Sequence, residues 1–264
     1  MKPRRTKLIS KLVKTTIILK DRELAQYVPK TVPMSSKGLA SMLTQYGMVY
    51  IKPTIGALGI GVMRVERFGN EGYRYQSGKA KYAFSSFASM YASIRRRVGA
   101  KPYLVQRGIY LLKHLDRPFD FRVMVQRNPR GQWECTGTVA RLAHPKKIVT
   151  NGSQGGTIYP SAQLLRYAAG TKKAAQVIRR MESISLQTAR LLSKSDPTLH
   201  VFGLDIAIDR QLRPWMLEVN TNPDPCPFTK VQDASMLRKI LRYAKAHGQT
   251  YTLHCIKARK APAT

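Results

Sequence analysis

The chain has 264 residues, 43% of them hydrophobic, and 46 basic against 14 acidic residues give a formal net charge of +32. This length and apolar content can bury a core in one large domain or two closely joined lobes. No apolar run approaches the roughly 20 residues needed to cross a bilayer, so we expect no membrane span. The positive charge indicates polyanionic surroundings such as nucleotide phosphates, nucleic acid or an acidic polymer.

The N-terminal residues are basic, with only a short apolar patch at Thr16–Leu19 and no small-residue cleavage site. We therefore do not interpret them as a signal peptide. The three cysteines, Cys135, Cys226 and Cys255, are odd in number and widely spaced. They indicate a reducing cytosol, with neither a disulfide framework nor a zinc site.

A glycine-rich loop connects two predicted strands within residues 48–65. The first strand ends at Lys52, the loop carries Gly56, Gly59 and Gly61, and strand character returns at Val62. The loop lacks the lysine of a P-loop and the third glycine and helix of a dinucleotide fingerprint. Its glycines allow backbone N–H groups to approach phosphate oxygens, beside the charge of Lys52. An ordinary hairpin loop is the alternative.

Further strands are predicted at 103–109, 119–127 and 133–142, and the last two flank a turn at 128–131. Arg122 and Arg141 lie inside these two strands. Such arginines are usually solvated, yet beside a phosphate site they would suit bidentate contact. The loop at 146–157, with Asn151, Gly155 and Gly156, is either a segment that closes over a substrate or an ordinary turn. Apolar spacing predicts a helix at about 171–194, and a last helix at about 234–247 ends before a glycine.

The residues from Gly203 to Pro223 form the most informative segment, because apolar and polar positions alternate on both sides of a polar turn. This period of two predicts a β-hairpin. With the turn centred between Gln211 and Leu212, Asp205 lies opposite Glu218, and Ala207 lies opposite Met216.

Like charges that face each other across a ladder repel, so the acidic pair needs a cation or a raised pKa on one member. Asn220 adds a neutral oxygen on the same face. Asp205, Glu218 and Asn220 together form an all-oxygen set of the kind that holds Mg²⁺, which shares its remaining positions with water and phosphates. A solvated hairpin face without a ligand is the alternative.

Four motifs occur in order: KPTIGALGIGV, YLVQRGIYLL, FDFRVMVQRNPRGQWECTGTVARLAHPKKIVTNGSQGG and FGLDIAIDRQLRPWMLEVNTNP. In this order and spacing, the chain resembles the ATP-grasp superfamily, and most closely its YheC/YheD family of endospore coat-associated proteins, from about residue 11 to 230. The resemblance implies an α+β ATP-grasp fold, with antiparallel sheets in two α/β lobes and the nucleotide between them.

The resemblance also implies a role for each matching residue. Arg122 and Arg141 resemble catalytic arginines that contact phosphate and acyl phosphate. Asp205, Glu218 and Asn220 match the Mg²⁺ ligands, with Mn²⁺ as an alternative metal. The implied ATP-binding residues are Lys11, Lys52, the flap glycines Gly56, Gly59 and Gly61, and the adenine hinge Gln106, Arg107 and Ile109.

The expected organisation is a basic N-terminal arm and start of the fold (1–30), a small lobe with the glycine flap (31–108), a large lobe with the metal site (109–233), and a C-terminal helix with a basic tail (234–264). Residues 11–233 together form one ATP-grasp domain. Two features depart from the related sequences. Ala57 stands where serine is frequent, and only 51 residues precede Lys52, so we expect the usual separate N-terminal domain to be missing.

The function implied is that of an ATP-dependent carboxylate–amine or carboxylate–thiol ligase that forms ADP through an acyl phosphate, with an unidentified carboxylate and nucleophile. We expect a cytoplasmic protein with endospore-coat association. The alternative is a non-catalytic structural protein that retains the fold and binds an acidic polymer or spore-coat components through its basic arm and tail. Specific nucleic-acid binding is the weakest option, because a recognised nucleic-acid module is lacking.

Overall fold

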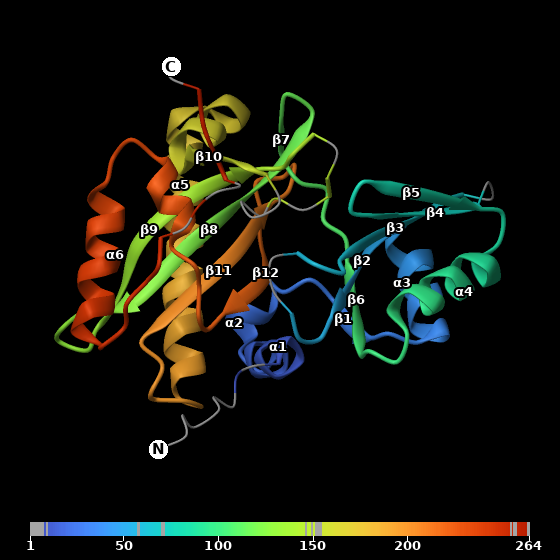
Figure 1. Ribbon diagram of the computed structural model, residues 1–264, viewed down its shortest axis with the longest axis horizontal. Helices are drawn as coiled ribbons and strands as arrows, with labels where there is room; N and C mark the ends of the chain where they lie inside the picture. The colour runs from blue at the N-terminus through green and yellow to red at the C-terminus, as the bar shows by residue number, and fades with distance from the viewer. Residues whose placement is uncertain are drawn as a thin grey trace. The chain divides into compact units, whose positions relative to one another are not determined.

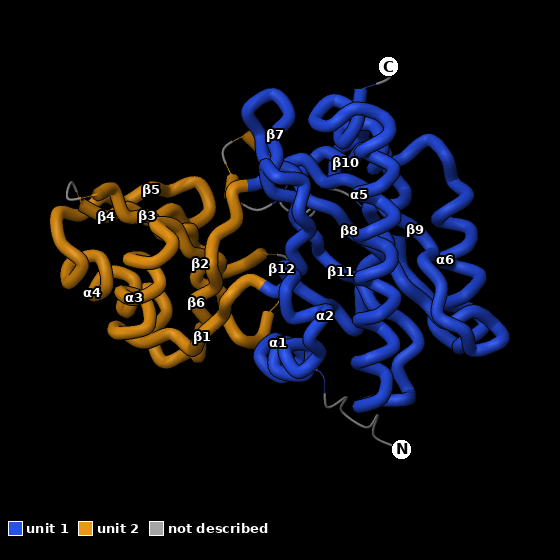
Figure 2. The backbone as a smooth tube through the Cα atoms, turned by 180° about the vertical axis from the view of Figure 1, so that it is seen from behind, with its two compact units in different colours: residues 1–28, 111–143, 150–264 blue, residues 29–110, 144–149 orange. Residues whose placement is uncertain are grey.

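The computed structural model describes residues 8, 10–56, 59–69, 72–145, 147–148, 150, 155–253, 255 and 258–262. They fall into two compact units: a larger one within 1–28, 111–143 and 150–264, and a smaller one within 29–110 and 144–149 (Figure 2). The first two helices and the last helix belong to the larger unit. Within the described ranges, no helix combines the length and apolar character needed to span a bilayer.

The smaller unit is a six-stranded antiparallel sheet with two helices packed on one face (Figure 1). Its strands follow the spatial order β1-β6-β2-β3-β4-β5. The elements are β1 (Thr31–Pro33), α3 (Ser36–Tyr46), β2 (Met48–Pro53), β3 (Met63–Phe68), β4 (Gly72–Ser77), β5 (Ala80–Phe84), α4 (Phe87–Val98) and β6 (Tyr103–Arg107).

Strand alternation decides which side of this sheet is apolar. On β3, Met63 and Val65 are buried against the helices, whereas Arg64 and Glu66 point to the opposite face. The helices begin at polar caps, as Ser35 Oγ accepts a hydrogen bond from the backbone N–H of Gly38 at 3.0 Å. The core therefore lies between α3, α4 and one face of the sheet, and the other face carries the polar side chains.

The larger unit contains the second sheet, whose order is β12-β11-β8-β9-β10-β13, with β7 paired to β8. All of its pairings are antiparallel except that of β10 with β13, which confirms the expected α+β class with mainly antiparallel sheets. The elements are α1 (Lys11–Leu19), α2 (Arg22–Ala25), β7 (Lys113–His114), β8 (Arg117–Arg127), β9 (Trp133–Leu142), β10 (Thr157–Pro160), α5 (Ser161–Ser193), β11 (Val201–Ile208), β12 (Pro214–Asn220), the 3₁₀ helix η2 (Cys226–Lys230), α6 (Ser235–Ala246) and β13 (Arg259–Lys260).

Different helices pack on the two faces of this sheet. Phe121 and Ile206 belong to the main core with residues of α1 and α5, whereas Met124 and Val139 pack with residues of η2 and α6. Helix α5 begins earlier than the expected helix at 171, and it is broken at Gly170, whose φ of 74° is non-helical. The last helix lies within the expected range.

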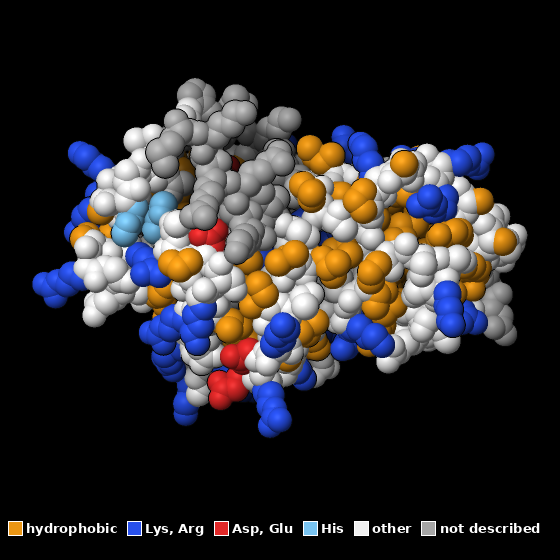
Figure 3. All heavy atoms as spheres, turned by 90° about the horizontal axis from the view of Figure 1, so that it is seen from below, with side chains coloured by type: hydrophobic (Ala, Val, Ile, Leu, Met, Phe, Trp, Pro, Cys, Tyr) orange, Lys and Arg blue, Asp and Glu red, His pale blue; other side chains and the backbone are white. Residues whose placement is uncertain are grey.

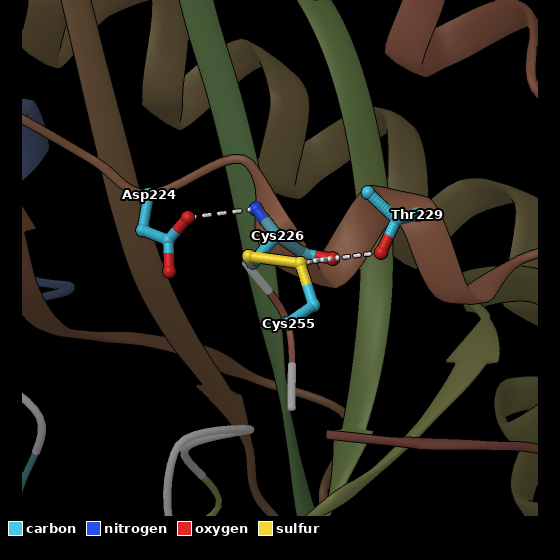
Figure 4. Close-up of a disulfide and its surroundings, with 4 residues drawn as sticks. All are labelled: Asp224, Cys226, Thr229 and Cys255. Atoms are coloured by element: carbon cyan, nitrogen blue, oxygen red, sulfur yellow. Dashed lines mark hydrogen bonds between the residues drawn. A yellow bond between two sulfur atoms is a disulfide. The ribbon is translucent and has the colours of Figure 1, made fainter. Parts of the chain in front are cut away.

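A disulfide joins Cys226 at the start of η2 to Cys255 near the C-terminus (Figure 4). The expectation that the cysteines form no disulfide was therefore wrong. Separation along the chain was a poor guide, because folding brings these two residues together over 29 positions. Asp224 Oδ1 accepts a hydrogen bond from Cys226 N at 2.9 Å, and Thr229 Oγ1 donates to Cys226 O at 2.8 Å. Cys135 remains a free thiol.

Candidate functional site

Four charged side chains form a buried ion cluster on the η2 and α6 side of the larger sheet. Arg122 Nε donates to Asp205 Oδ1 at 2.7 Å, and Arg141 Nη2 lies 3.1 Å from Asp205 Oδ2. Arg141 also makes a bidentate contact with Asp120, through Nε to Oδ1 at 2.8 Å and Nη2 to Oδ2 at 2.7 Å. The strand register explains the cluster, because Asp205 stands opposite Arg122 and Asp120 stands opposite Arg141.

The cluster is electrically balanced, with two guanidinium groups and two carboxylates. Burial alone would raise the pKa of Asp205, but Arg122 and Arg141 outweigh it and lower that pKa to about 2. Burial alone would likewise lower the pKa of Arg141, but Asp120 and Asp205 raise it above its ordinary value. Asp205 is therefore held as an anion. The usual solvated position of a strand arginine does not apply here, since Arg141 is only 2% exposed.

The predicted pairing of Asp205 with Glu218 is confirmed, and Gly203 stands opposite Asn220. The predicted pairing of Ala207 with Met216 is wrong, because the register shifts beyond Asp205 and Met216 lies opposite Ile206. Leu217 is the extra residue of this β-bulge. The shift leaves Glu218 on the polar side and places Met216 in the main core.

The protein itself supplies the cations that the acidic pair requires. Asp205 is neutralised by the arginines, and Glu218 Oε1 lies 3.6 Å from the Nζ of Lys11 on α1. Lys14, one turn further along α1, is buried in the same region. Burial lowers the pKa of Lys14 to about 8, although Glu218 opposes the change and Lys11 adds to it. Lys11, expected to contact nucleotide, thus lies beside one of the expected metal ligands.

The expected metal ligands carry the oxygen donors that Mg²⁺ prefers, and both Asp205 oxygens contact arginines. Asp205 and Glu218 form one pair of the β11–β12 hairpin, and Asn220 lies two residues beyond Glu218 on the same face. The set offers only oxygen donors once the Asn220 amide nitrogen faces the Gly203 carbonyl at 3.5 Å. Glu218 is accessible, with 23% of its side chain exposed. In the described part of the chain, no three His, Cys, Asp or Glu side chains gather into a metal cage. A set of few protein oxygens of this kind suits an ion that keeps water and phosphate ligands.

In the smaller unit, Lys52 is held by side chains of neighbouring strands. Its Nζ donates to Gln106 Oε1 at 2.6 Å, and Gln106 Nε2 donates to Thr31 Oγ1 at 3.2 Å. The Lys52 Nζ also lies 5.9 Å from the centre of the Tyr50 ring. Lys52 and Gln106, both expected at the nucleotide, are thus in direct contact.

The expected adenine hinge is partly occupied by sheet hydrogen bonds. The backbone N–H of Arg107 donates to Lys30 O at 2.8 Å, and that of Gly108 donates to Met48 O at 3.0 Å. The Arg107 guanidinium lies 5.0 Å from the Tyr46 ring centre, and the Ile109 side chain is buried. Hinge contacts with adenine therefore cannot use the N–H of Arg107 while this sheet is intact.

The flap glycines have backbone conformations that favour glycine, since φ is 151° at Gly56, 71° at Gly59 and 75° at Gly61. A Cβ at Gly61 would lie 2.8 Å from the Tyr103 hydroxyl. The flap residue Ala57 lies outside the described residues.

The second loop is described only in part. Asn151 lies outside the described residues. Gly155 has a φ of 86°, and Gly156 O accepts a hydrogen bond from Arg259 N at 3.0 Å. Gly156 is thus bound to the β13 segment, and its carbonyl is not directed at a substrate in this structure.

Sequence reasoning missed Asp120 and Lys14. Asp120 precedes Arg122 by two residues on a predicted strand, so the period of two already placed both on one face. Lys14 carried no comparable signal, because nothing in its neighbourhood along the chain indicates that α1 packs against β12.

A family model described as YheC/D-like ATP-grasp matches residues 5–246. Endospore coat-associated protein YheD of Bacillus subtilis (strain 168) is 27% identical over 238 residues, which cover 86% of this chain and 52% of that protein. Endospore coat-associated protein YheC of the same organism is 25% identical over 202 residues, covering 75% and 55%. The chain thus spans about half the length of these curated relatives.

Among solved structures, an N5-carboxyaminoimidazole synthase from Aspergillus clavatus, in complex with ADP and 5-aminoimidazole ribonucleotide, has a TM-score of 0.52 with this chain. The match covers 96% of this chain and 54% of that one at 8% sequence identity. At such an identity the likeness shows the fold alone, and the family model that matches residues 5–246 gives that fold as ATP-grasp.

Proposed function

This chain belongs to the YheC/D-like ATP-grasp family, and from that premise we propose that it binds ATP with Mg²⁺ and activates a carboxylate for ligation. A carboxylate oxygen would attack the γ-phosphorus with ADP as the leaving group. An amine or thiol would then attack the acyl carbon, lose its proton and displace phosphate. Such chemistry depends on positioning and charge neutralisation, and it requires no nucleophilic side chain from the protein.

The observation that carries the proposal is the pairing of Asp205 with Glu218, beside Asn220 and against two arginines. We assign Glu218 and Asn220 as the accessible Mg²⁺ ligands, and Asp205 as an inner carboxylate kept anionic by its arginines. When bound, the metal would neutralise charge on the phosphate oxygens. Lys52, in the smaller unit, is the proposed phosphate lysine.

The two arginines receive different roles. Arg122 uses its Nε to donate to Asp205, which leaves its two terminal nitrogens to donate to a phosphate oxygen. Its Nη1 packs close to Gly203, where an added Cβ would lie only 3.4 Å away. Arg141 is committed to two carboxylates and is almost fully buried. We therefore assign Arg122 to substrate contact and Arg141 to positioning Asp205, in place of the catalytic contact expected for both.

Thermal unfolding with and without Mg-ATP tests the proposal. Ligand that binds only the folded state at about ten times its Kd stabilises the protein by about 1.4 kcal/mol, and this gain should require Mg²⁺. Glu218→Gln should remove the Mg²⁺-dependent part, whereas Glu23→Gln, which changes an exposed residue on α2 by the same chemistry, should keep it. Asp205→Asn is a poorer choice because it breaks the buried ion cluster. Wild-type protein that gains no stability would refute nucleotide binding.

Ligase activity needs a separate measurement, namely ADP release with a panel of amino acids, peptides and cell-wall acids. Release that depends on one acid and one nucleophile, and that is lost in Glu218→Gln, supports the ligase. ADP release without an acceptor would indicate simple hydrolysis.

A non-catalytic, spore-associated role is the second candidate, and the disulfide is the observation that favours it. Disulfides persist in oxidising surroundings such as cell and particle surfaces and are rare in a reducing cytosol. The curated relatives carry the name of endospore coat-associated proteins. Under this role Mg-ATP would still bind, no acceptor would stimulate ADP release, and Glu218→Gln protein would associate with spore coat as well as wild type.

A further inference from the structure

The polar face of the smaller sheet carries a group of charged residues that the proposed ATP chemistry does not use. Arg64 and Glu66 lie on β3, Arg74 and Gln76 on β4, and Lys81 on β5. The register places Glu66 opposite Arg74, Arg64 opposite Gln76, and Gln76 opposite Lys81. Because directly opposed residues of a sheet point to the same face, all five side chains gather on one side.

These residues line a cavity of about 90 Å³, together with Tyr75. That space has room for several water molecules, so it accommodates a head group such as a carboxylate or a phosphate. The lining of the cavity is mainly charged, because three of its side chains are cations and one is an anion.

The contacts within the cavity leave positive charge and hydrogen-bond donors in excess. Glu66 Oε2 accepts from Arg64 Nη2 at 2.9 Å and from Arg74 Nε at 2.7 Å, so one carboxylate oxygen holds both arginines. With Lys81 the group has a net charge of +2. The Arg64 Nε is buried and has no hydrogen-bond partner. A buried N–H without an acceptor is destabilising, and an oxyanion in the cavity would supply one.

We propose that this cavity is an anion-binding site for a carboxylate or phosphate group of an acidic ligand. Arg64 and Arg74 form the fork that holds the oxyanion, Lys81 adds a point charge, and Glu66 fixes the arginines. All the lining residues belong to the smaller unit, so the proposal does not require the metal ligands of the larger unit. Lys52 lies on the same face of the sheet, because Tyr50, two residues before it on β2, stands opposite Arg64 on β3.

The test is calorimetric titration with inorganic phosphate in one arm and succinate in the other, at constant ionic strength. A matched control is essential because exposed Lys and Arg side chains are spread over the surface (Figure 3), and any anion is attracted to a chain of net charge +32. Arg67 provides that control. It lies on β3 as well, but its Nη1 contacts Thr44 on the helix side at 3.4 Å.

We expect Arg64→Gln and Arg74→Gln to weaken the tighter of the two probes at least about tenfold, the scale of one charge-assisted hydrogen bond. Arg67→Gln should change its Kd less than about twofold, since it removes the same charge outside the cavity. Equal losses in all three variants would show non-specific attraction and overturn the site, as would failure of both probes to bind wild type.

Glu66→Gln supplies a test with the opposite sign, in case an arginine variant does not fold. It removes the competing negative charge and retains a side-chain oxygen for the arginines, so we expect several-fold tighter binding of either anion. Unchanged or weaker binding would count against the site. Circular dichroism of each ligand-free variant confirms that the comparison is made between folded proteins. The arm that binds more tightly identifies the ligand as a phosphate or a carboxylate compound.

Discussion

Asp120→Asn is the sharpest test of the buried ion cluster. In the wild-type protein two arginines and two aspartates balance, and Arg141 is 2% exposed while Asp120 is 3% exposed. The variant keeps the shape of the side chain and one acceptor oxygen, but it leaves the cluster with a net charge of +1. An arginine side chain does not lose its proton in proteins, so Arg141 cannot relieve the imbalance by deprotonation.

The expected cost follows from the burial of the pair. Removing one partner of a buried ion pair costs about 3–5 kcal/mol, and we expect about 3 kcal/mol because the amide oxygen still accepts one hydrogen bond. For a unit of this size, the Tm should fall by about 6–12 °C. The loss concerns the larger unit, where both partners lie.

Urea unfolding followed by tryptophan fluorescence measures this loss selectively. Both tryptophans of the chain, Trp133 and Trp215, lie in the larger unit. Asp196→Asn is the control, since Asp196 lies at the surface in contact with Thr198, and it should cost less than about 1 kcal/mol.

A double variant decides whether charge imbalance is the cause. Asp120→Asn combined with Arg141→Met leaves Arg122 and Asp205 as a neutral pair, so it should recover most of the stability lost in Asp120→Asn. The reasoning fails if Asp120→Asn costs less than about 1 kcal/mol. It also fails if the double variant loses the sum of the two single losses.

Three further predictions concern acid and thiol chemistry. The folded-state pKa of Asp205 is lowered to about 2 from an ordinary 3.8. Its contribution to stability, on the order of 2 kcal/mol, is therefore present above about pH 4 and is lost as pH falls toward 2. Urea midpoints across that range should drop, and a flat profile would contradict the ion cluster. Reduction of the disulfide, or Cys255→Ser, should lower the free energy of unfolding by about 3–4 kcal/mol, as expected for a closed loop of about 30 residues. Cys135→Ser protein should respond to reductant like wild type. Urea unfolding with and without dithiothreitol measures both effects. Burial raises the pKa of Cys135 to about 12, so iodoacetamide at about pH 8 should label Cys135 slowly in folded protein and rapidly in urea; equal rates would show that the thiol is accessible.

The hairpin shows how far the sequence alone could be followed. Alternation and turn position correctly placed Asp205 opposite Glu218, because a period of two is a local property of the strand. The bulge at Leu217 could not be foreseen, since it depends on the fit of Met216 into a core formed by distant helices. A local pattern therefore specified the pair, and packing specified the register beyond it.

The environment of the arginines was also beyond local reasoning. The strands that contain Arg122 and Arg141 were predicted, but their burial depends on carboxylates from two other positions, Asp120 and Asp205. The helices α3 and α4 were not predicted, although Met90, Ile94 and Val98 of α4 recur every four residues, which is the spacing of an amphipathic helix. The disulfide was missed for a related reason, since it joins segments that only the tertiary fold brings together.

The disulfide also protects an open sheet edge. The short strand β13 is the last of the larger sheet, and its segment bonds to β10 through Arg259 N to Gly156 O and Ala261 N to Ile158 O, at 3.0 and 3.2 Å. Two residues of parallel pairing are weak alone, and Cys255 anchors the chain just before them. Without that anchor, β10 would expose unpaired backbone groups to strand addition by another molecule. Reductant during purification would then promote aggregation of folded protein, quite apart from its effect on unfolding.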